Sequence, residues 1–223
     1  YLNKGLILYN DDQLLEAKLI LEKTVKIFKG DQVTNQALNT LKEISIETGK
    51  VDVFSEWLKK EQINSFSESE ISNSAFESIE KYFFEKKNKQ AQKQIQDFLL
   101  RYPNHSKTTL LKYYLADINF QDKQWNNAFQ LYEQIMNLPF NEYSEKSIVN
   151  AILSLQNLNQ SLNTESLLVK LKKITVHEEN INFANTNLMA LYFSKGDFFK
   201  ARDISSEILN QKYIDSNIYQ DAI

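Results

Sequence analysis

The sequence of 223 residues contains no cysteine, only two prolines and only four glycines. Without cysteine the chain has no disulfide, no thiolate metal site and no cysteine nucleophile. At average usage a chain of this length would contain roughly 15 glycines and 11 prolines. Sandwiches and barrels need turn residues about every 8–12 positions, so this shortage argues against an all-β fold and favours helices.

The chain also lacks a large excess of charge and a long apolar run. Its 26 Lys and Arg against 29 Asp and Glu give a net charge of −3, which excludes the basic footprint of a nucleic-acid-binding protein. No apolar run approaches the roughly 18 residues of a transmembrane helix, so we expect no direct membrane insertion. Hydrophobic residues at 42% and charged residues at 25% are typical of a folded protein.

Sequence motifs that carry chemistry are missing as well. The two histidines lie far apart, and His177 precedes Glu178-Glu179, as a solvated histidine at a helix start would. With no second histidine nearby, a three-ligand zinc site is not visible. No glycine-rich phosphate loop and no G-x-S-x-G motif occurs. We therefore expect no enzyme activity, no metal and no cofactor.

What the chain does have is a repeat of 37 residues. Three series of mostly apolar positions share this spacing: Leu14, Val51, Asn88, Trp125 and Leu162; Ala17, Phe54, Ala91, Ala128 and Glu165; Leu21, Leu58, Ile95, Tyr132 and Val169. The last unit is expected to slip by one residue, onto Phe198 and Ala201. Dividing 223 by 37 gives about six units.

Each unit has the pattern of two helices. In the third unit, apolar residues at helical spacing form two stripes, Phe76–Phe83 and Ala91–Leu99, and Pro103 ends the second. The fourth unit repeats this pattern, and Pro139 ends it. Neither helix of a pair can bury its stripe alone, whereas stacked pairs bury a continuous core. The sequence therefore predicts an all-α solenoid of about six helix-turn-helix repeats.

The stretch Leu188–Ala201 resembles one unit of the tetratricopeptide repeat (TPR) family. The resemblance is carried by Tyr192, the turn Gly196-Asp197-Phe198 and the small residue Ala201. The same frame occurs in part in the other units. The resemblance implies a right-handed superhelix whose first helices line a concave face and bind protein partners.

The texture of the chain, rich in Asn, Lys and Ile, is similar to multi-repeat TPR proteins of Gram-negative cell envelopes. This similarity implies a periplasmic or envelope location, with the cytoplasm as the alternative. Both ends look cut from a longer protein. We expect residues 1–223 to form a single solenoid, with the polar stretch 61–74 as either a simple inter-repeat loop or a hinge. Ser72, Asn73 or Ser74 is expected to cap the helix after it.

Two columns of side chains, 37 residues apart, are expected on the concave face. One is mainly acidic, and the other, three residues on, is mainly aromatic, includes Ile46 and continues with Phe193. Phe76 and Tyr113 lie one turn before the acids. The candidate partner-binding residues are Tyr9, Glu43, Phe76, Glu80, Phe83, Tyr113, Asp117, Phe120 and Phe193. Such a surface suits a basic peptide with an apolar anchor. In the alternative interpretation, the aromatic rings are buried between repeats and the acids are simply solvated.

The predicted function is a non-enzymatic scaffold that binds a protein or peptide. The alternative is a spacer that self-associates through its ends, where Leu2, Leu6, Tyr9, Ile214 and Ile218 would lack neighbours.

Overall fold

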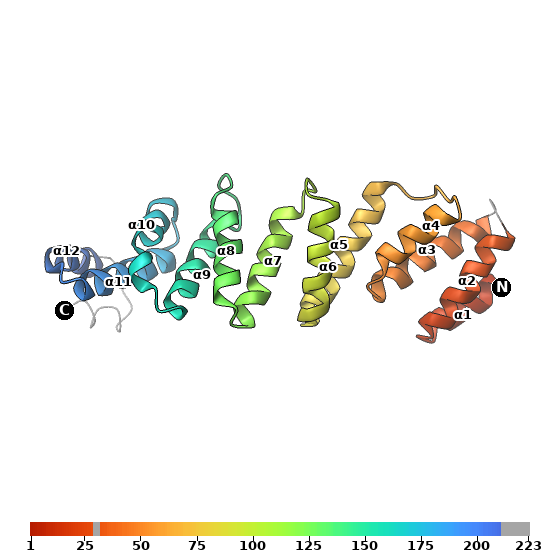
Figure 1. Cartoon of the computed structure of the whole chain (residues 1–223), viewed down its shortest axis with the longest axis horizontal. Helices are drawn as coiled ribbons and strands as arrows, with labels where there is room; N and C mark the ends of the chain where they lie inside the picture. The colour runs from red at the N-terminus through yellow and green to blue at the C-terminus, as the bar shows by residue number, and fades with distance from the viewer. Residues whose placement is uncertain (29–31, 211–223) are drawn as a thin grey trace. The chain divides into compact units, whose positions relative to one another are not determined.

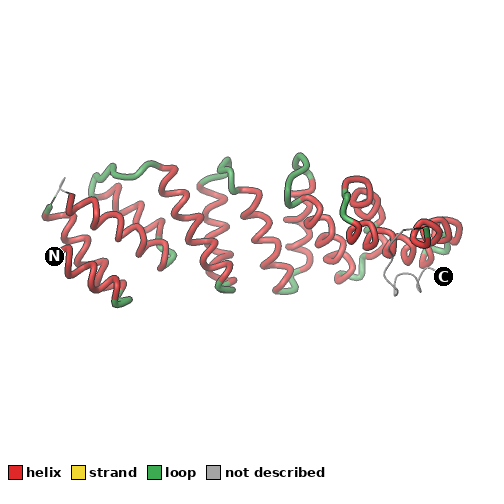
Figure 2. The backbone as a smooth tube through the Cα atoms, turned by 180° about the vertical axis from the view of Figure 1, so that it is seen from behind, coloured by secondary structure: helices red, strands yellow, loops and turns green. Residues whose placement is uncertain are grey.

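The computed structural model describes residues 1–28 and 32–210, and the regular structure of these residues is entirely helical (Figures 1 and 2). The α-helices follow one another as hairpins: α1 (Leu2–Asn10) and α2 (Leu14–Ile27), α3 (Gln32–Glu47) and α4 (Val51–Lys60), α5 (Glu68–Phe84) and α6 (Asn88–Arg101), α7 (Thr108–Gln121) and α8 (Trp125–Met136), α9 (Ser144–Asn157) and α10 (Glu165–Ile174), α11 (Glu178–Ser194) and α12 (Phe198–Leu209). A short 3-10 helix, Ser161–Asn163, precedes α10. None of the described helices is long and apolar enough to cross a membrane.

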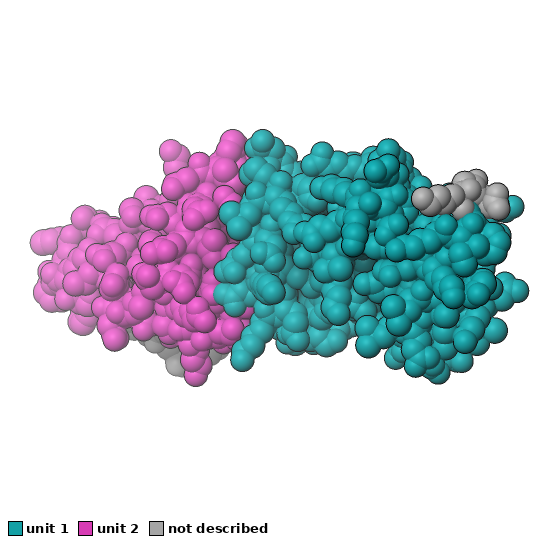
Figure 3. Space-filling model, turned by 45° about the vertical axis from the view of Figure 1, so that its right-hand side comes forward, with its two compact units in different colours: residues 1–108 teal, residues 109–223 magenta. Residues whose placement is uncertain are grey.

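The chain divides into two compact units, residues 1–108 and 109–223, which Figure 3 colours separately. In unit 1, α3 lies against both helices of the hairpin before it and against α5 of the hairpin after it. In unit 2, α9 lies against α8 and α10, and α11 against α10 and α12. Within each unit the hairpins pack on their sequence neighbours, which confirms the all-α hairpin solenoid. A hinge at 61–74 lies inside unit 1 and stays a prediction.

All six hairpins reverse direction through the same backbone motif. The first helix ends in a residue with φ between 58° and 74°: Asp12, Gly49, Lys86, Lys123, Asn159 and Gly196. In the first hairpin, Asp12 N–H donates to the Tyr9 carbonyl at 3.0 Å and Gln13 N–H to the Leu8 carbonyl at 2.8 Å. This pair of bonds defines the Schellman motif, which satisfies the last carbonyls of a helix. Only two of the six positions are glycine, so four turns hold a side chain in the left-handed region.

The turn positions correct the predicted place of the one-residue slip. Successive left-handed residues are 37 apart except between Lys123 and Asn159, so the slip falls between the fourth and fifth hairpins rather than in the last unit. In the fifth hairpin Thr164 is therefore the small buried residue (2% exposed), and not Glu165. Leu168 is buried for the same reason, whereas the predicted Val169 is 49% exposed.

Small residues let the two helices of a hairpin approach closely. Ala17, Ala91 and Ala128 are completely buried, and Phe54 is the large exception at the equivalent position. A Cβ on Gly5 would lie 2.6 Å from Leu21 Cδ2, which shows how near α1 comes to α2. Two hydrophobic clusters result. One joins the first two hairpins and ends at Ile71, and the other fills unit 2.

The start of α5 corrects the predicted cap. Helix α5 begins at Glu68, and Ser67 caps it: Ser67 Oγ accepts from Glu70 N–H at 3.2 Å, and Ser67 N–H donates to Glu70 Oε2 at 2.8 Å. This capping box immediately precedes the buried Ile71. Ser72 and Ser74, two of the predicted caps, are instead buried side chains within the helix.

Lys123→Gly should stabilise the chain. The lysine has φ of 59°, a left-handed conformation that costs a residue with a Cβ about 1–2 kcal/mol and that glycine adopts freely. Glycine also makes the unfolded chain more flexible, which lowers stability by about 0.4–1 kcal/mol, the smaller of the two effects. We expect a gain of about 0.5–1 kcal/mol in the free energy of unfolding, measured by urea denaturation. Lys123→Ala removes the same charge but keeps a Cβ, so it should change stability little. Equal effects of the two substitutions would contradict this account.

Candidate functional site

The candidate site of unit 1 lies on the exposed side of the first helices of its hairpins, here called the first-helix face. On α3 it includes Glu43, whose side chain is 51% exposed, and Glu47 one turn later. The Lys42 ammonium lies 3.8 Å from the Glu43 carboxylate. Glu80, on α5, is half-buried. The face therefore carries carboxylates on two successive first helices.

Tyr9 joins α1 to this acidic side of α3. Its hydroxyl donates to Glu47 Oε1 at 2.9 Å. Burial, helped by the negative charge of the Glu47 carboxylate, raises the pKa of Tyr9 to about 12. The phenol is thus a fixed donor near neutral pH, and Tyr9 as a whole is half-buried.

Phe83 and Phe76 on α5 have different surroundings. Phe83 is half-buried: the Phe84 ring packs edge-on at 5.5 Å, and the Lys86 ammonium lies 5.9 Å from its centroid. Phe76 is 8% exposed, with Lys107 over its ring at 5.1 Å. Phe76 therefore differs from its predicted role, because a buried ring offers a partner little surface.

In unit 2, the predicted residues of α7 belong to an aromatic cluster. Tyr113 stacks on Tyr143 at 5.3 Å and meets Tyr132 at 6.1 Å. Phe120 packs edge-on against Trp125 at 4.9 Å. Both Tyr113 and Phe120 are half-buried, and burial raises the pKa of the Tyr113 phenol. Both rings thus take part in packing, as the alternative interpretation expects, and both remain partly exposed.

The remaining unit 2 residues are more open. Asp117 is half-buried and accepts a hydrogen bond from Gln121 Nε2 at 2.6 Å. Phe193 is 67% exposed and meets Phe198, 60% exposed, edge-on at 5.4 Å across the Gly196 turn. Two exposed phenylalanines at one turn form an apolar surface that a partner can cover.

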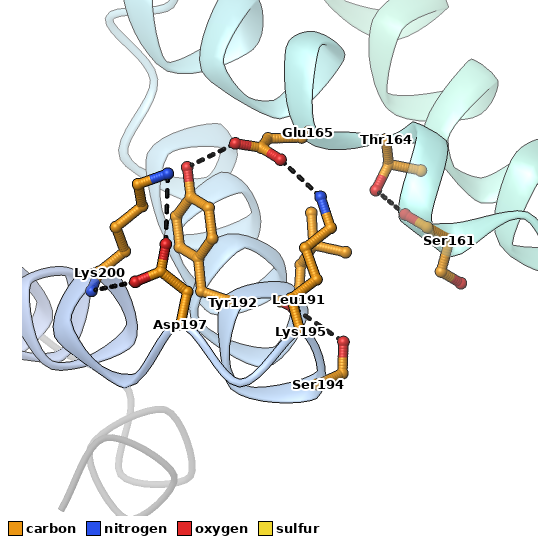
Figure 4. A network of polar contacts seen from close by, with 9 residues as sticks. All are labelled: Ser161, Thr164, Glu165, Leu191, Tyr192, Ser194, Lys195, Asp197 and Lys200. Atoms are coloured by element: carbon orange, nitrogen blue, oxygen red, sulfur yellow. Dashed lines mark hydrogen bonds and ion pairs between the residues drawn. The ribbon is translucent and has the colours of Figure 1, made fainter.

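A polar network between α10, α11 and α12 in unit 2 is centred on the Glu165 carboxylate (Figure 4). Glu165 accepts from Tyr192 Oη at 3.1 Å and from Lys195 Nζ at 2.6 Å, while Lys200 pairs with Asp197 at 3.3 Å. The hydrogen bond from Lys195 lowers the pKa of the Glu165 carboxyl. A carboxylate held ionised by an ammonium and a phenol joins neighbouring hairpins; it is not poised to exchange protons near neutral pH.

The structure adds two residues that the sequence analysis missed. Glu47 accepts the Tyr9 hydrogen bond, and Phe84 is 66% exposed on α5. Their spacing was a usable signal, because Glu47 follows Glu43 by four residues and Phe84 follows Glu47 by 37. His177 is exposed just before α11, as predicted. In residues 1–28 and 32–210, no group of three or more His, Cys, Asp or Glu could hold a metal ion.

No family model and no curated protein matches the chain. Among solved structures, two of a putative kinesin light chain from Podosopora anserina, described as nearly identical TPR-like repeats, are similar at 15% identity, with TM-scores of 0.48 and 0.46. These matches cover 77% and 79% of this chain and 91% and 97% of theirs. Pseudomonas aeruginosa PilF is similar at 15% identity and a TM-score of 0.48, over 99% of this chain and 94% of that one. All three scores lie below 0.5, so the assignment to the hairpin-solenoid class does not rest on these matches. It rests on the turns, the small buried residues and the packing of successive hairpins described above.

Tyr9→Phe should destabilise the chain by about 1 kcal/mol at pH 7, because it removes the hydroxyl that Glu47 accepts. The folded-state pKa of Tyr9 lies above its usual value of 10.0, so its contribution is complete below pH 10 and is lost as the pH rises toward 12. The stability difference between wild type and variant should therefore shrink over this range in urea denaturation. A difference that stays constant to pH 12 would contradict the assigned hydrogen bond.

Proposed function

We propose that the chain is a non-enzymatic scaffold that binds a protein or peptide partner on the first-helix faces of its hairpins. The observation that carries the proposal is the combination, on adjacent first helices, of an exposed carboxylate at Glu43 with the half-buried Phe83 and the exposed Phe84. Aromatic edges supply apolar contact area, and carboxylates attract and orient a cation.

The partner segment is proposed to be basic with an apolar anchor. Glu43 is exposed on α3, and the half-buried Glu47 and Glu80 add two further carboxylates on α3 and α5. Lys and Arg side chains of a peptide would pair with these groups, and an apolar side chain would cover the phenylalanine edges. A role in a cell-envelope complex is part of this proposal and is supported by the likeness in sequence texture alone.

Glu43→Lys should weaken binding of a fluorescein-labelled peptide of alternating lysine and leucine about fivefold to tenfold at low salt. Reversing one exposed charge changes the interaction by about 1–1.4 kcal/mol, and added salt should reduce the difference. The measurement is fluorescence polarisation, with circular dichroism to establish that the variant folds. Glu80→Lys tests the same face on α5, and Asp117→Lys tests the equivalent side of α7 in unit 2.

The matched control is Glu56→Lys, which makes the same charge change at an exposed position of α4, a second helix. It should change the affinity for the peptide only slightly, through the altered net charge of the protein. If Glu43→Lys, Glu80→Lys and Asp117→Lys all bind the peptide as the wild type does, the first-helix face is not the site.

Self-association is the second candidate, and one residue favours it specifically. Ile7 is 60% exposed, whereas the equivalent Ile44 and Leu191 are 3% and 5% exposed within the hydrophobic clusters. The outer side of α1 thus presents an apolar position that the second and sixth hairpins bury, and a second copy of the chain could cover it. Of the other predicted end residues, Leu2, Leu6 and Tyr9 are half-buried, and Ile214 and Ile218 lie outside the described residues.

If this surface mediates self-association, Ile7→Asp should abolish the concentration dependence of the mass measured by sedimentation equilibrium. Leu19→Asp is the control, because Leu19 is 66% exposed but its equivalents in the next two hairpins, Glu56 and Lys93, are polar and exposed. This position therefore normally faces solvent. A wild-type chain that stays monomeric over a wide concentration range would rule the second candidate out.

A further inference from the structure

Unit 1 contains a cavity of about 370 Å³ between the start of α4 and the helices α5 and α6, here called the α4–α6 cavity. Apolar and aromatic side chains make much of its lining, among them Val51, Ile79, Tyr82 and Phe98. Its volume falls in the range of about 300–1,000 Å³ that is typical of ligand pockets.

The α4–α6 cavity exists because two residues of α5 have small side chains. Ala75 and Ser78 occupy the places that Leu38 and Leu41 fill in the preceding hairpin, where both leucines are buried. A hollow one hairpin earlier, lined at the four equivalent positions Leu14, Leu15, Leu41 and Ser45, measures only about 40 Å³. At Gly49, a Cβ would lie 2.3 Å from Gln94 Nε2, so the turn closes tightly over this side of the cavity.

This cavity is distinct from the first-helix face. Its α5 residues, Ile71, Ala75, Ser78, Ile79 and Tyr82, follow helical spacing along one stripe. Residues 76, 80 and 83 form a second stripe about 120° around the same helix, because each residue turns the helix by about 100°. A ligand in the cavity and a peptide on the first-helix face would therefore contact different sides of α5.

The mouth of the cavity carries more positive than negative charge. Asp52 and Arg101 face each other across it at 3.8 Å. Lys50, Lys93 and Asp97 complete the charged lining, and neither lysine makes an ion pair with another described residue. The lining thus has three cations and two anions, spread along both walls. This distribution suits a chain with several polar groups and an excess of negative charge better than it suits a neutral apolar molecule.

One polar atom of the lining lacks a partner. Gln94 Oε1 is buried and accepts no hydrogen bond from any described residue. A buried acceptor without a donor costs about 1–3 kcal/mol, and a backbone N–H of a bound peptide is the type of donor it needs. The cavity therefore offers apolar volume, a hydrogen-bond acceptor and a cationic rim together.

We propose that the α4–α6 cavity binds an acidic peptide segment of a partner protein. A large apolar side chain of the segment enters the space beside Ala75 and Ile79, and a peptide N–H donates to Gln94 Oε1. A carboxylate next to the apolar residue lies near Lys50 or Lys93. This site goes beyond the proposed function, because it lies on another side of the repeat and prefers the opposite charge.

The test is a selection from a phage library of random linear peptides on the wild-type protein, with counter-selection on Ala75→Leu, which fills the cavity with the side chain found one hairpin earlier. Enriched peptides should carry a large apolar residue beside Asp or Glu. For a selected peptide measured by fluorescence polarisation, Ala75→Leu should raise Kd about tenfold or more, and Lys93→Glu about fivefold. Glu43→Lys, on the first-helix face, should leave Kd unchanged.

Circular dichroism and urea unfolding establish that each variant folds. If Ala75→Leu does not fold, Lys50→Glu and Lys93→Glu still test the site, because both lysines are exposed and their substitution should not disturb folding. The proposal is overturned if no recovered peptide is sensitive to the cavity or rim variants, or if the sensitive peptides are basic. Failure of the lysine–leucine peptide to bind would affect only the first-helix face, so the two proposals fail separately.

Discussion

The left-handed residue at the end of each first helix is the constraint on which the rest of the structure depends. It reverses the chain within a few residues and satisfies the last carbonyls of the helix, so the second helix must return along the first. Lys86 and Lys123 adopt this conformation although lysine disfavours it, which shows that hairpin packing outweighs local strain. Because the same turn recurs, each hairpin presents equivalent sides to its neighbours.

The recurrence tolerates a change of spacing. Between Lys123 and Asn159 the period shortens by one residue, and the burial pattern after it moves by one residue as well, onto Thr164 and Leu168. A globular core would have to repack throughout to absorb such a change. A stack of hairpins absorbs it locally, since each hairpin contacts only the hairpins beside it. Sites built on separate hairpins can therefore vary independently.

In unit 1, differences in side-chain size and charge give the repeated hairpin two chemically different surfaces. On one side of α5, Glu80 and Phe83 continue the acidic and aromatic first-helix face. On a different side of α5, Ala75 and Ser78 leave a cavity where the previous hairpin has leucine. The first surface is acidic and the second has a cationic rim, so the two would select different partners.

The sequence by itself determined the helices, their pairing and the period, because apolar spacing and the prolines after α6 and α8 are local signals. Glu43 is exposed, as a partner-binding residue needs to be, and its role in binding stays a prediction. The sequence could not show that lysines occupy left-handed turns, where the slip falls, or that Phe76 is buried while Phe84 is exposed. Only the tertiary structure decided these points, and with them the α4–α6 cavity, because burial and empty volume depend on which neighbouring helix lies against a side chain and how closely.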